Sequence, residues 1–189
     1  MRIISGRLKG RRIQPPRLTA TRPTTDFAKT ALFNILNNQF DFEAVSFLDL
    51  FAGTGNHSFE FASRGSTVIV SVDKDPVCVE FMQGRCAEWK VEGMSVVRAD
   101  VLRFIDQCRM QFDVIFAGPP YALPEIDSLP DRIFKAGLLR PGGWFILETS
   151  DKHAYEGHPF FFRMRHYGQT HFHFFAAEAA SLRDLYSNN

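Results

Sequence analysis

The chain has 189 residues, of which 45% are hydrophobic and 23% charged, and its formal net charge is +1. This composition is close to the globular average, which excludes a disordered or fibrous chain, and the length suits one main domain with a sizeable core. No stretch approaches 18 apolar residues and the N-terminus lacks an apolar signal region, so we expect a cytoplasmic protein without a membrane span.

The charges are unevenly distributed. Residues 1–30 carry eight Lys or Arg and one acid, which leaves a net charge of −6 for residues 31–189. A basic N-terminal arm suits a nucleic-acid backbone, because neutralising phosphates releases condensed counterions. A merely solvated run of charges is the alternative, and we favour nucleic acid.

The first segments have predictable structure. Residues 2–14 hold two short apolar pieces around a basic turn, which predicts a small hairpin ended by Pro15 and Pro16. A helix with apolar residues at helical spacing follows, and Thr25 or Asp26 can cap its first turn.

Strand-like and helical segments then alternate. Such alternation predicts βαβ units and a parallel sheet, whose ligand crevice lies at the carboxyl ends of the strands. We expect two aromatic antiparallel strands within 160–175 and a terminal helix within 176–189. The other expected strands are 45–50, 67–72, 94–98, 112–116 and 144–148, and the expected helices are 56–64, 76–89, 101–108 and 125–136.

The stretch from Val45 to Gly55 predicts a ligand site. It is an apolar run with one Asp, followed by small residues and two glycines, which is typical of a buried strand turning tightly into a helix. Gly53 and Gly55 lack the Cβ that would keep a ligand from the backbone, and the helix presents unpaired N–H groups.

The acidic residues around this loop favour a cationic adenosine ligand. Asp73 follows Gly55 by 18 positions, and a carboxylate there can accept both hydroxyls of a ribose. Ser58 stands where a dinucleotide fingerprint has its third glycine, and Asp49 would repel a pyrophosphate. Electrostatics therefore favour S-adenosylmethionine over NAD.

A second motif, Gly118-Pro-Pro-Tyr121, directly follows a predicted strand. Two prolines fix the direction of the backbone carbonyls, and Tyr121 offers a ring on which a planar base can stack. We predict that this turn holds the target base. His171 and His173 lack a third metal ligand and Cys108 lacks an activating base, so we expect neither a metal site nor a cysteine nucleophile.

Several motifs occur in the order typical of one bacterial family, and through them the chain resembles the RsmD family over about residues 1–175. Members are methyltransferases that modify the exocyclic N2 of one guanine in small-subunit ribosomal RNA. The motifs are Met1-Arg-Ile-Ile-Ser-Gly6, Lys9-Gly-Arg11, Thr21-Arg-Pro-Thr-Thr-Asp26, Leu32-Phe-Asn-Ile-Leu36, the loop 49–55, Glu60, Ser63-Arg-Gly65, the Pro-Pro-Tyr121 turn and Tyr167-Gly168.

The resemblance implies a class I S-adenosylmethionine-dependent methyltransferase fold (α/β, Rossmann-like). This fold has a mostly parallel seven-stranded sheet with an antiparallel C-terminal strand, here preceded by the small hairpin. It implies an RNA-binding arm at 1–24, a methyltransferase domain at 25–175 and a tail at 176–189. The expected partner is small-subunit rRNA or the assembled 30S particle, and we expect a monomer.

The resemblance also implies residue roles. The loop and Asp73 would hold the cofactor, its adenine would lie near Asp100 and Val101, and residues 22–24 would close over it. The full cofactor set is Arg22, Thr24, Asp49, Phe51, Ala52, Gly53, Thr54, Gly55, Asp73, Lys74, Asp100, Val101 and Ala117. The RNA-binding set is Arg2, Lys9, Arg11, Arg12 and Arg22, and the catalytic set is Gly118, Pro119, Pro120 and Tyr121.

Gly118 departs from the family, which has Asp or Asn at this position. In the family, that side chain and the carbonyl of the first proline together accept hydrogen bonds from the target amine, so the resemblance implies that the Pro119 carbonyl alone remains here. The lost hydrogen bond is worth roughly 1.5–3 kcal/mol, or on the order of ten- to a hundredfold in rate if it acts only in the transition state. One alternative is therefore a weak or silent homologue that binds cofactor and RNA. Methylation of another amine, such as adenine N6 in DNA, is a second alternative, because Pro-Pro-Tyr turns also occur in adenine-N6 methyltransferases.

Overall fold

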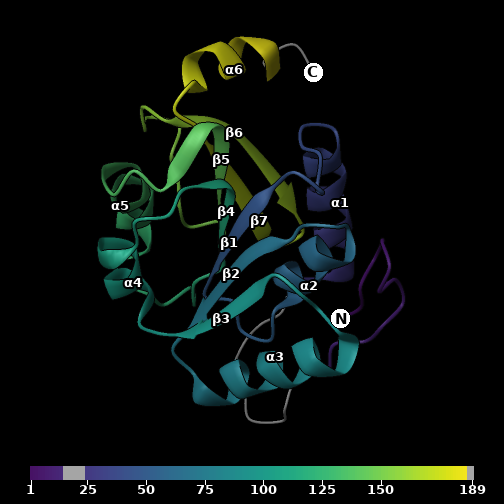
Figure 1. The fold of residues 1–189 in the computed structure, drawn as a ribbon. Coiled ribbons are helices and arrows are strands. Elements are labelled where there is room, and N and C mark those ends of the chain that lie inside the picture. Colours follow the sequence, from purple (N-terminus) through teal and green to yellow (C-terminus); the bar gives the residue numbers. More distant parts are fainter. Residues whose placement is uncertain (15–23, 187–189) are drawn as a thin grey trace.

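The computed structural model describes residues 1–14 and 24–186, and in this part of the chain seven strands form one sheet (Figure 1). The strand order is β3-β2-β1-β4-β5-β7-β6, with β7 antiparallel to both of its neighbours and the other pairs parallel. This confirms the predicted class I fold. The strands are β1 (Ser46–Leu50), β2 (Val68–Asp73), β3 (Met94–Arg98), β4 (Phe112–Ala117), β5 (Leu139–Thr149), β6 (Phe161–Tyr167) and β7 (Thr170–Phe175).

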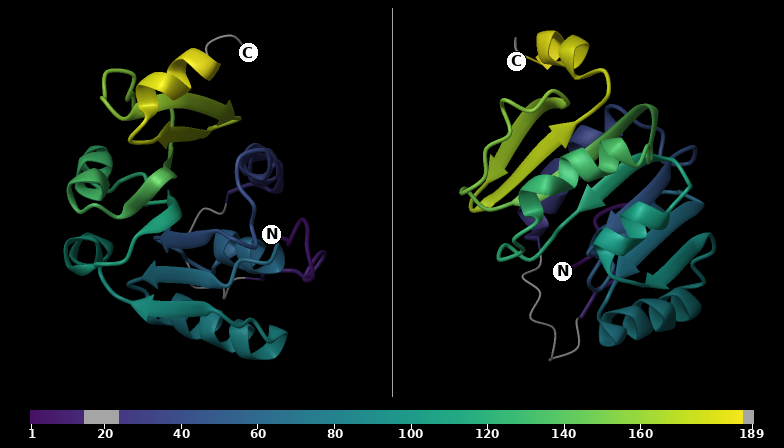
Figure 2. Two further views of the ribbon diagram at one scale, coloured as in Figure 1. Left: turned by 45° about the horizontal axis from the view of Figure 1, so that its top comes forward. Right: turned by 90° about the vertical axis from the view of Figure 1, so that its left-hand side faces the viewer.

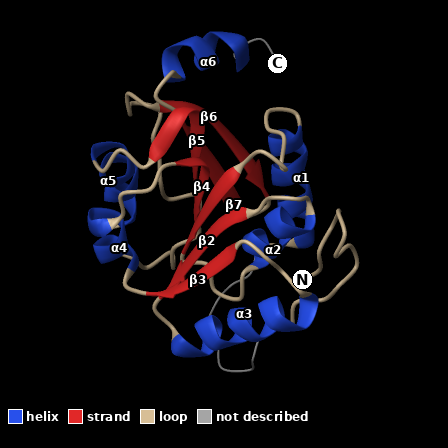
Figure 3. Ribbon diagram, in the orientation of Figure 1, coloured by secondary structure: helices blue, strands red, loops and turns tan. Residues whose placement is uncertain are grey.

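Helices cover both faces of the sheet, as Figures 2 and 3 show. One face packs against α1 (Asp26–Asn37), α2 (Asn56–Ser63), α3 (Pro76–Trp89) and α6 (Ala179–Tyr186). The other packs against α4 (Val101–Gln107), the 3-10 turn η1 (Ile126–Ser128) and α5 (Leu129–Lys135). Two apolar layers result, which explains why the central strands are continuous buried runs.

Local sequence signals set the helix starts. The Thr25 hydroxyl accepts the Ala28 N–H, and the side chains of Asp75 and Asp100 cap α3 and α4 in the same way. Pro76 is the first residue of α3, where the helix was expected to begin.

Two predicted elements differ in detail. The helix expected over 125–136 is divided into η1 and α5. Strand β5 begins earlier than expected, because Leu139 pairs with Phe112 before Trp144 pairs with Val114. The residues between Leu139 and Trp144 bulge out of the ladder instead of ending it.

Residues 1–14 form the small hairpin that was predicted, with one antiparallel bridge, Arg2 to Arg12, and no longer strand. The backbone of this segment bonds both itself and α2. Ile3 N–H donates to the Arg11 carbonyl at 2.9 Å and Ile13 N–H to the Met1 carbonyl at 3.1 Å. Ile4 and Ser5 donate to the Glu60 carboxylate at 2.8 and 3.0 Å. Ile3, Leu8 and Ile13 are buried in the same apolar layer as α1 and α2.

Glycine is required where this segment meets α2. Gly6 has φ +78°, and a Cβ there would lie 1.8 Å from the Ser63 carbonyl oxygen. Arg7 N–H donates to that oxygen at 2.8 Å, so the close approach itself makes a hydrogen bond. A side chain at position 6 would separate the segment from α2.

Candidate active site

The loop after β1 and the turn after β4 lie side by side at the carboxyl edge of the sheet. Asp49 pairs with Phe116 and Leu50 with Ala117 in the β1–β4 ladder. Beyond the ladder, Gly118 N–H donates to the Leu50 carbonyl at 3.2 Å. Strand pairing thus brings together two motifs that are more than sixty residues apart in sequence.

The loop has an uncommon backbone conformation. Phe51, Gly53 and Gly55 have φ of 59°, 55° and 77°, so three of its residues are left-handed. Phe51 is not glycine, and this conformation costs a bulky residue on the order of 1 kcal/mol or more. Such strain is concentrated at functional sites.

Gly55 ends the loop where space is limited. A Cβ at this position would lie 2.9 Å from the Phe59 ring and 3.1 Å from the Met82 sulfur. The Gly55 N–H donates to the Ala52 carbonyl at 2.8 Å, and α2 begins at the next residue. Glycine at this position therefore leaves room for the Phe59 side chain of α2 and the Met82 side chain of α3.

Asp73 is fixed beside the loop at the end of β2. Its Oδ2 accepts the Gly53 N–H at 2.7 Å, and its Oδ1 accepts the Asp75 N–H at 2.9 Å. Each carboxylate oxygen can accept a further hydrogen bond, so the vicinal hydroxyls of a ribose remain compatible with this geometry. Lys74 follows it and is exposed.

The end of β3 supplies the next pair of predicted residues. Asp100 is exposed and accepts the Arg103 N–H at 3.1 Å, which caps α4, and Val101 is buried against the second face of the sheet. Ala99 N–H donates to the Asp73 carbonyl at 3.1 Å. This bond brings the predicted adenine-binding residues next to the predicted ribose-binding carboxylate.

Asp49 lies beneath the loop. Its side chain is fully buried, and its Oδ2 accepts the Ser58 N–H at 3.1 Å and the Ser58 hydroxyl at 2.5 Å. Burial raises the pKa of this carboxyl to about 7, although the Ser58 bonds act in the opposite direction. The cofactor-binding role predicted for Asp49 would therefore be electrostatic, because its carboxylate is buried against Ser58.

This burial predicts pH-dependent cofactor binding. Between the ordinary Asp pKa and about 7 the folded protein binds more protons than the unfolded chain, so ionising Asp49 destabilises the ligand-free fold as pH rises. A cationic ligand favours the ionised form. We expect the Kd for S-adenosylmethionine to fall by up to about tenfold from pH 6 to pH 8, measured by calorimetry.

Asp49→Asn should bind more weakly and lose this pH dependence. The same Kd measurements from pH 6 to pH 8 with S-adenosylhomocysteine, which lacks the sulfonium charge, separate the effect of the sulfonium from that of the amino group. If the Kd of Asp49→Asn for S-adenosylmethionine changed with pH as much as that of the wild type, the pH dependence would belong to another group.

The turn after β4 is partly buried and ordered. Pro119 is buried, Pro120 is exposed, and the Pro120 carbonyl accepts the Leu123 N–H at 2.9 Å. The prediction assigns the acceptor role to the preceding carbonyl, that of Pro119. Tyr121 is half-buried beside these prolines.

Two polar residues near this edge were not predicted as site residues. Glu148, at the end of β5, accepts the Thr24 hydroxyl at 2.6 Å and is buried. His57 is buried in α2 and packs against Phe116 with the ring centroids 4.0 Å apart, and burial lowers its pKa to about 3. Glu148 could have been found in the sequence as a polar residue near the end of an apolar strand. His57 has no such sequence signal and is recognised only from its packing.

The predicted RNA-binding residues lie on the N-terminal segment. Lys9 and Arg12 are exposed, Arg2 pairs with Asp26 at 3.5 Å, and Arg11 lies over the Trp89 ring at 5.4 Å. Arg22 lies outside the described residues. An open hollow of about 400 Å³ is lined by Met1, Arg2, Arg12, Ile13, Gln14 and Asp26.

A family model described as "Conserved hypothetical protein 95" matches residues 1–176. The chain belongs to this family. Membership confirms the predicted RsmD-family assignment, since relatives named ribosomal RNA small subunit methyltransferase D match over most of the chain.

Among residues 1–14 and 24–186, none of the helices has the length and apolar character that a membrane span requires.

The family relatives match over most of their own length. YlbH of Bacillus subtilis is 32% identical over 152 residues, which are 78% of this chain and 82% of that protein. Ribosomal RNA small subunit methyltransferase D of Escherichia coli K12 is 27% identical over 149 residues, covering 79% and 71% of the two chains.

Solved structures share the fold. A hypothetical protein of Thermus thermophilus superposes with a TM-score of 0.83 at 28% identity, covering 94% of this chain and 99% of its own. The Thermus thermophilus 16S rRNA N2 G1207 methyltransferase RsmC, in complex with AdoMet and guanosine, has a TM-score of 0.65 at 23% identity, covering 82% and 44%. The second likeness concerns the fold alone.

Proposed function

We propose that the protein transfers a methyl group from S-adenosylmethionine to the exocyclic N2 of a guanine in small-subunit rRNA. The observation that carries the proposal is the hydrogen bond from Gly118 N–H to the Leu50 carbonyl, which joins the base-holding turn to the cofactor loop. Relatives named ribosomal RNA small subunit methyltransferase D support the substrate class.

The residues present fit this cofactor. Asp49, Asp73 and Asp100 surround the loop with negative charge, which suits a sulfonium and an amino group better than a pyrophosphate. Asp73 would hold the ribose, and Asp100 and Val101 the adenine. Main-chain atoms of Phe51 to Gly55, with Thr24, Lys74 and Ala117 nearby, would hold the remainder.

When bound, the cofactor would supply an electrophilic methyl group and would leave as S-adenosylhomocysteine. The Pro119 carbonyl accepts a hydrogen bond from that amine and so directs its lone pair, while Tyr121 stacks on the base. Direct displacement relies mainly on such positioning, because the nucleophile needs no activating base before attack. The departing proton passes to solvent.

RNA would be held by the basic N-terminal segment. Its predicted phosphate-binding residues are Arg2, Lys9, Arg11, Arg12 and Arg22. We propose that a monomer binds either free rRNA or the assembled 30S particle.

The direct test uses radiolabelled S-adenosylmethionine and small subunits that lack the modification. We expect label in the rRNA and, after nuclease digestion, in N2-methylguanosine. Label in N6-methyladenosine would indicate the alternative target amine. Absence of label, with normal cofactor and RNA binding, would favour the silent homologue, the second candidate that Gly118 in place of Asp or Asn supports.

A further inference from the structure

The hairpin formed by β6 and β7 presents an aromatic and basic face next to the catalytic edge. Residues 161–175 contain two arginines, three histidines and no acidic residue. Strand β6 is parallel to β5, so its carboxyl end, at Tyr167, points to the same edge as Gly118. A polyanion arriving at that edge meets a surface of the opposite charge.

The pairing of residues between neighbouring strands gives the position of this face relative to the turn after β4. Ala117 pairs with Leu147, and the next residue of β5, Glu148, pairs with Phe172, which pairs with Arg165. Arg165 is therefore level with Gly118, three strands away, or roughly 14 Å. Tyr167 stands two residues further along β6, beyond the edge.

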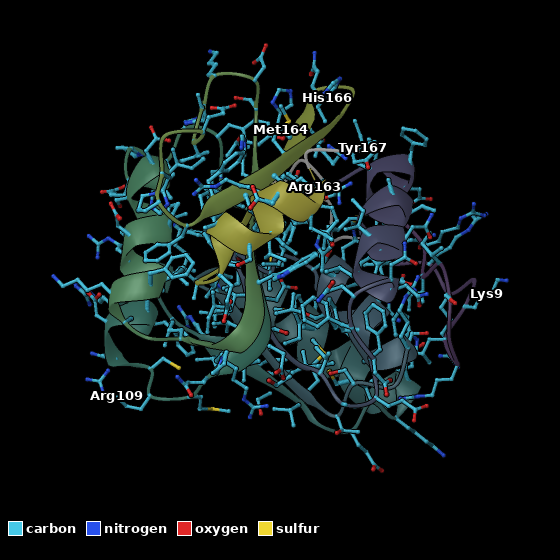
Figure 4. The ribbon with its side chains drawn as sticks, turned by 90° about the horizontal axis from the view of Figure 1, so that it is seen from above. Lys9, Arg109, Arg163, Met164, His166 and Tyr167 are labelled. Atoms are coloured by element: carbon cyan, nitrogen blue, oxygen red, sulfur yellow. The ribbon has the colours of Figure 1, made fainter. Side chains whose placement is uncertain are left out.

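Alternation along β6 puts Arg163, Arg165 and Tyr167 on one side of the strand. The Arg163 guanidinium lies over the Tyr186 ring of α6 at 4.7 Å, and the Tyr167 ring meets Phe27 of α1 at 5.8 Å. Figure 4 shows Tyr167 beside α1, with Arg163 and His166 on the same hairpin. The side between α1 and α6 therefore carries both arginines and the tyrosine.

Phe27 is the unusual residue of this surface, because 72% of it is exposed at the start of α1. Its edge-to-face contact with Tyr167, at an interplanar angle of 81°, holds the two rings together, and Tyr167 in turn packs on Phe172 at 6.1 Å. Aromatic residues held this way lose little entropy when a planar ligand stacks on them.

The pair also connects two proposed parts of the RNA surface. Phe27 follows Asp26, which lines the basic hollow with Arg2 and Arg12. It follows Thr24 by three residues, and the Thr24 hydroxyl bonds Glu148 at the edge. The Phe27–Tyr167 pair thus lies between the phosphate-binding segment and the catalytic edge.

We infer that the Phe27–Tyr167 pair stacks on an unpaired nucleotide near the target guanine, with Arg165 contacting the backbone of the same RNA strand. The inference deepens the proposed function and rests on it. Aromatic faces accept any base, and guanidinium groups match phosphate, so single-stranded RNA is the occupant that this combination fits. Arg165 lies roughly 14 Å from Gly118 and Tyr167 lies further along β6, so the pair contacts a nucleotide a few positions from the target and not the target itself.

The test compares Phe27→Ala and Tyr167→Ala with wild type by two measurements. Fluorescence anisotropy gives the Kd for a labelled, unstructured ten-nucleotide RNA, and steady-state methylation of naked rRNA gives KM and kcat. We expect each variant to raise the RNA Kd and the KM by about five- to a hundredfold, with little change in kcat and in cofactor Kd. Tyr167→Phe should behave like wild type, because stacking needs the ring and not the hydroxyl.

Met110→Ala is the matched control, since Met110 is also an exposed apolar residue, 49% exposed, at the opposite end of β4. It should leave Kd and KM unchanged. Unchanged RNA binding in both aromatic variants would overturn the inference, as would a defect seen only with assembled subunits, which would indicate a protein contact. The anisotropy measurement does not depend on methyl transfer, so it tests the inference even if wild type proves inactive.

Discussion

Replacing Glu60 by Gln is expected to lower the free energy of unfolding by about 3–5 kcal/mol, because it breaks a buried ion pair on one side. The Glu60 carboxylate is fully buried and accepts Lys29 Nζ at 3.0 Å and Arg64 Nε at 2.9 Å. It also accepts the Ile4 and Ser5 N–H groups. Urea denaturation followed by circular dichroism measures the change.

The Lys29 ammonium, which stays buried when its partner is removed, explains the size of the loss in unfolding free energy. Lys29 is fully buried, and burial lowers its pKa while Glu60 opposes that effect. Without Glu60 the Lys29 pKa should fall further, so the folded variant binds fewer protons than the unfolded chain as pH rises towards about 10.4. The loss in Glu60→Gln should therefore shrink between pH 7 and pH 10.

Two further variants make this prediction specific. Lys29→Met combined with Glu60→Gln should be less destabilised than the sum of the single changes, because the isolated charge is gone. Glu88→Gln removes an exposed i,i+3 partner of Arg85 and should cost less than about 1 kcal/mol. If Glu60→Gln lowered the free energy of unfolding no more than Glu88→Gln does, the buried ion pair would not account for the stability.

Replacing Gly118 by Asp is expected to raise kcat by about ten- to a hundredfold at an unchanged cofactor Kd. The added carboxylate would accept a second hydrogen bond from the target amine, beside the Pro119 carbonyl. Position 118 can take a side chain, since a Cβ there would lie 3.2 Å from the Phe116 ring edge and a small movement of that ring relieves the contact. Single-turnover methylation with saturating rRNA measures the effect.

Gly118→Ala is the control, because it adds the same Cβ without an acceptor. It should leave the rate unchanged or lower it slightly. Equal rates in the Asp and Ala variants would mean that the glycine turn is complete without a side chain at this position. A wild type with no turnover and a strongly active Asp variant would support the silent homologue.

The sequence by itself predicted most of the fold, because its signals are local. Alternating apolar runs and helical patterns set the order of strands and helices, and Thr25, one of the two capping residues predicted for α1, caps that helix. The carboxyl edge was predictable for the same reason: once the sheet is parallel, residues that follow successive strands share one edge. Gly118 and Leu50 are therefore neighbours as expected.

Tertiary structure alone decided which groups face inward. Asp49 precedes the glycine loop in sequence, yet its carboxylate lies beneath the loop on Ser58, because strand alternation directs its side chain towards α2. The N-terminal segment forms the hairpin that was predicted, but only the structure shows that the Ile4 and Ser5 amides also bond Glu60, which lies 56 residues beyond Ile4.

The same limit applies to the Phe27–Tyr167 pair. In sequence, Phe27 is simply the first apolar residue of a helix and Tyr167 part of a turn. Only the placement of α1 against β6 brings the two rings together, because contacts between distant segments depend on the packing of the whole sheet and leave no local pattern. Short sequence motifs thus predicted the residues at the carboxyl edge of the sheet. Long-range packing determined the burial of Asp49 beneath that edge and the position of the Phe27–Tyr167 pair beside it.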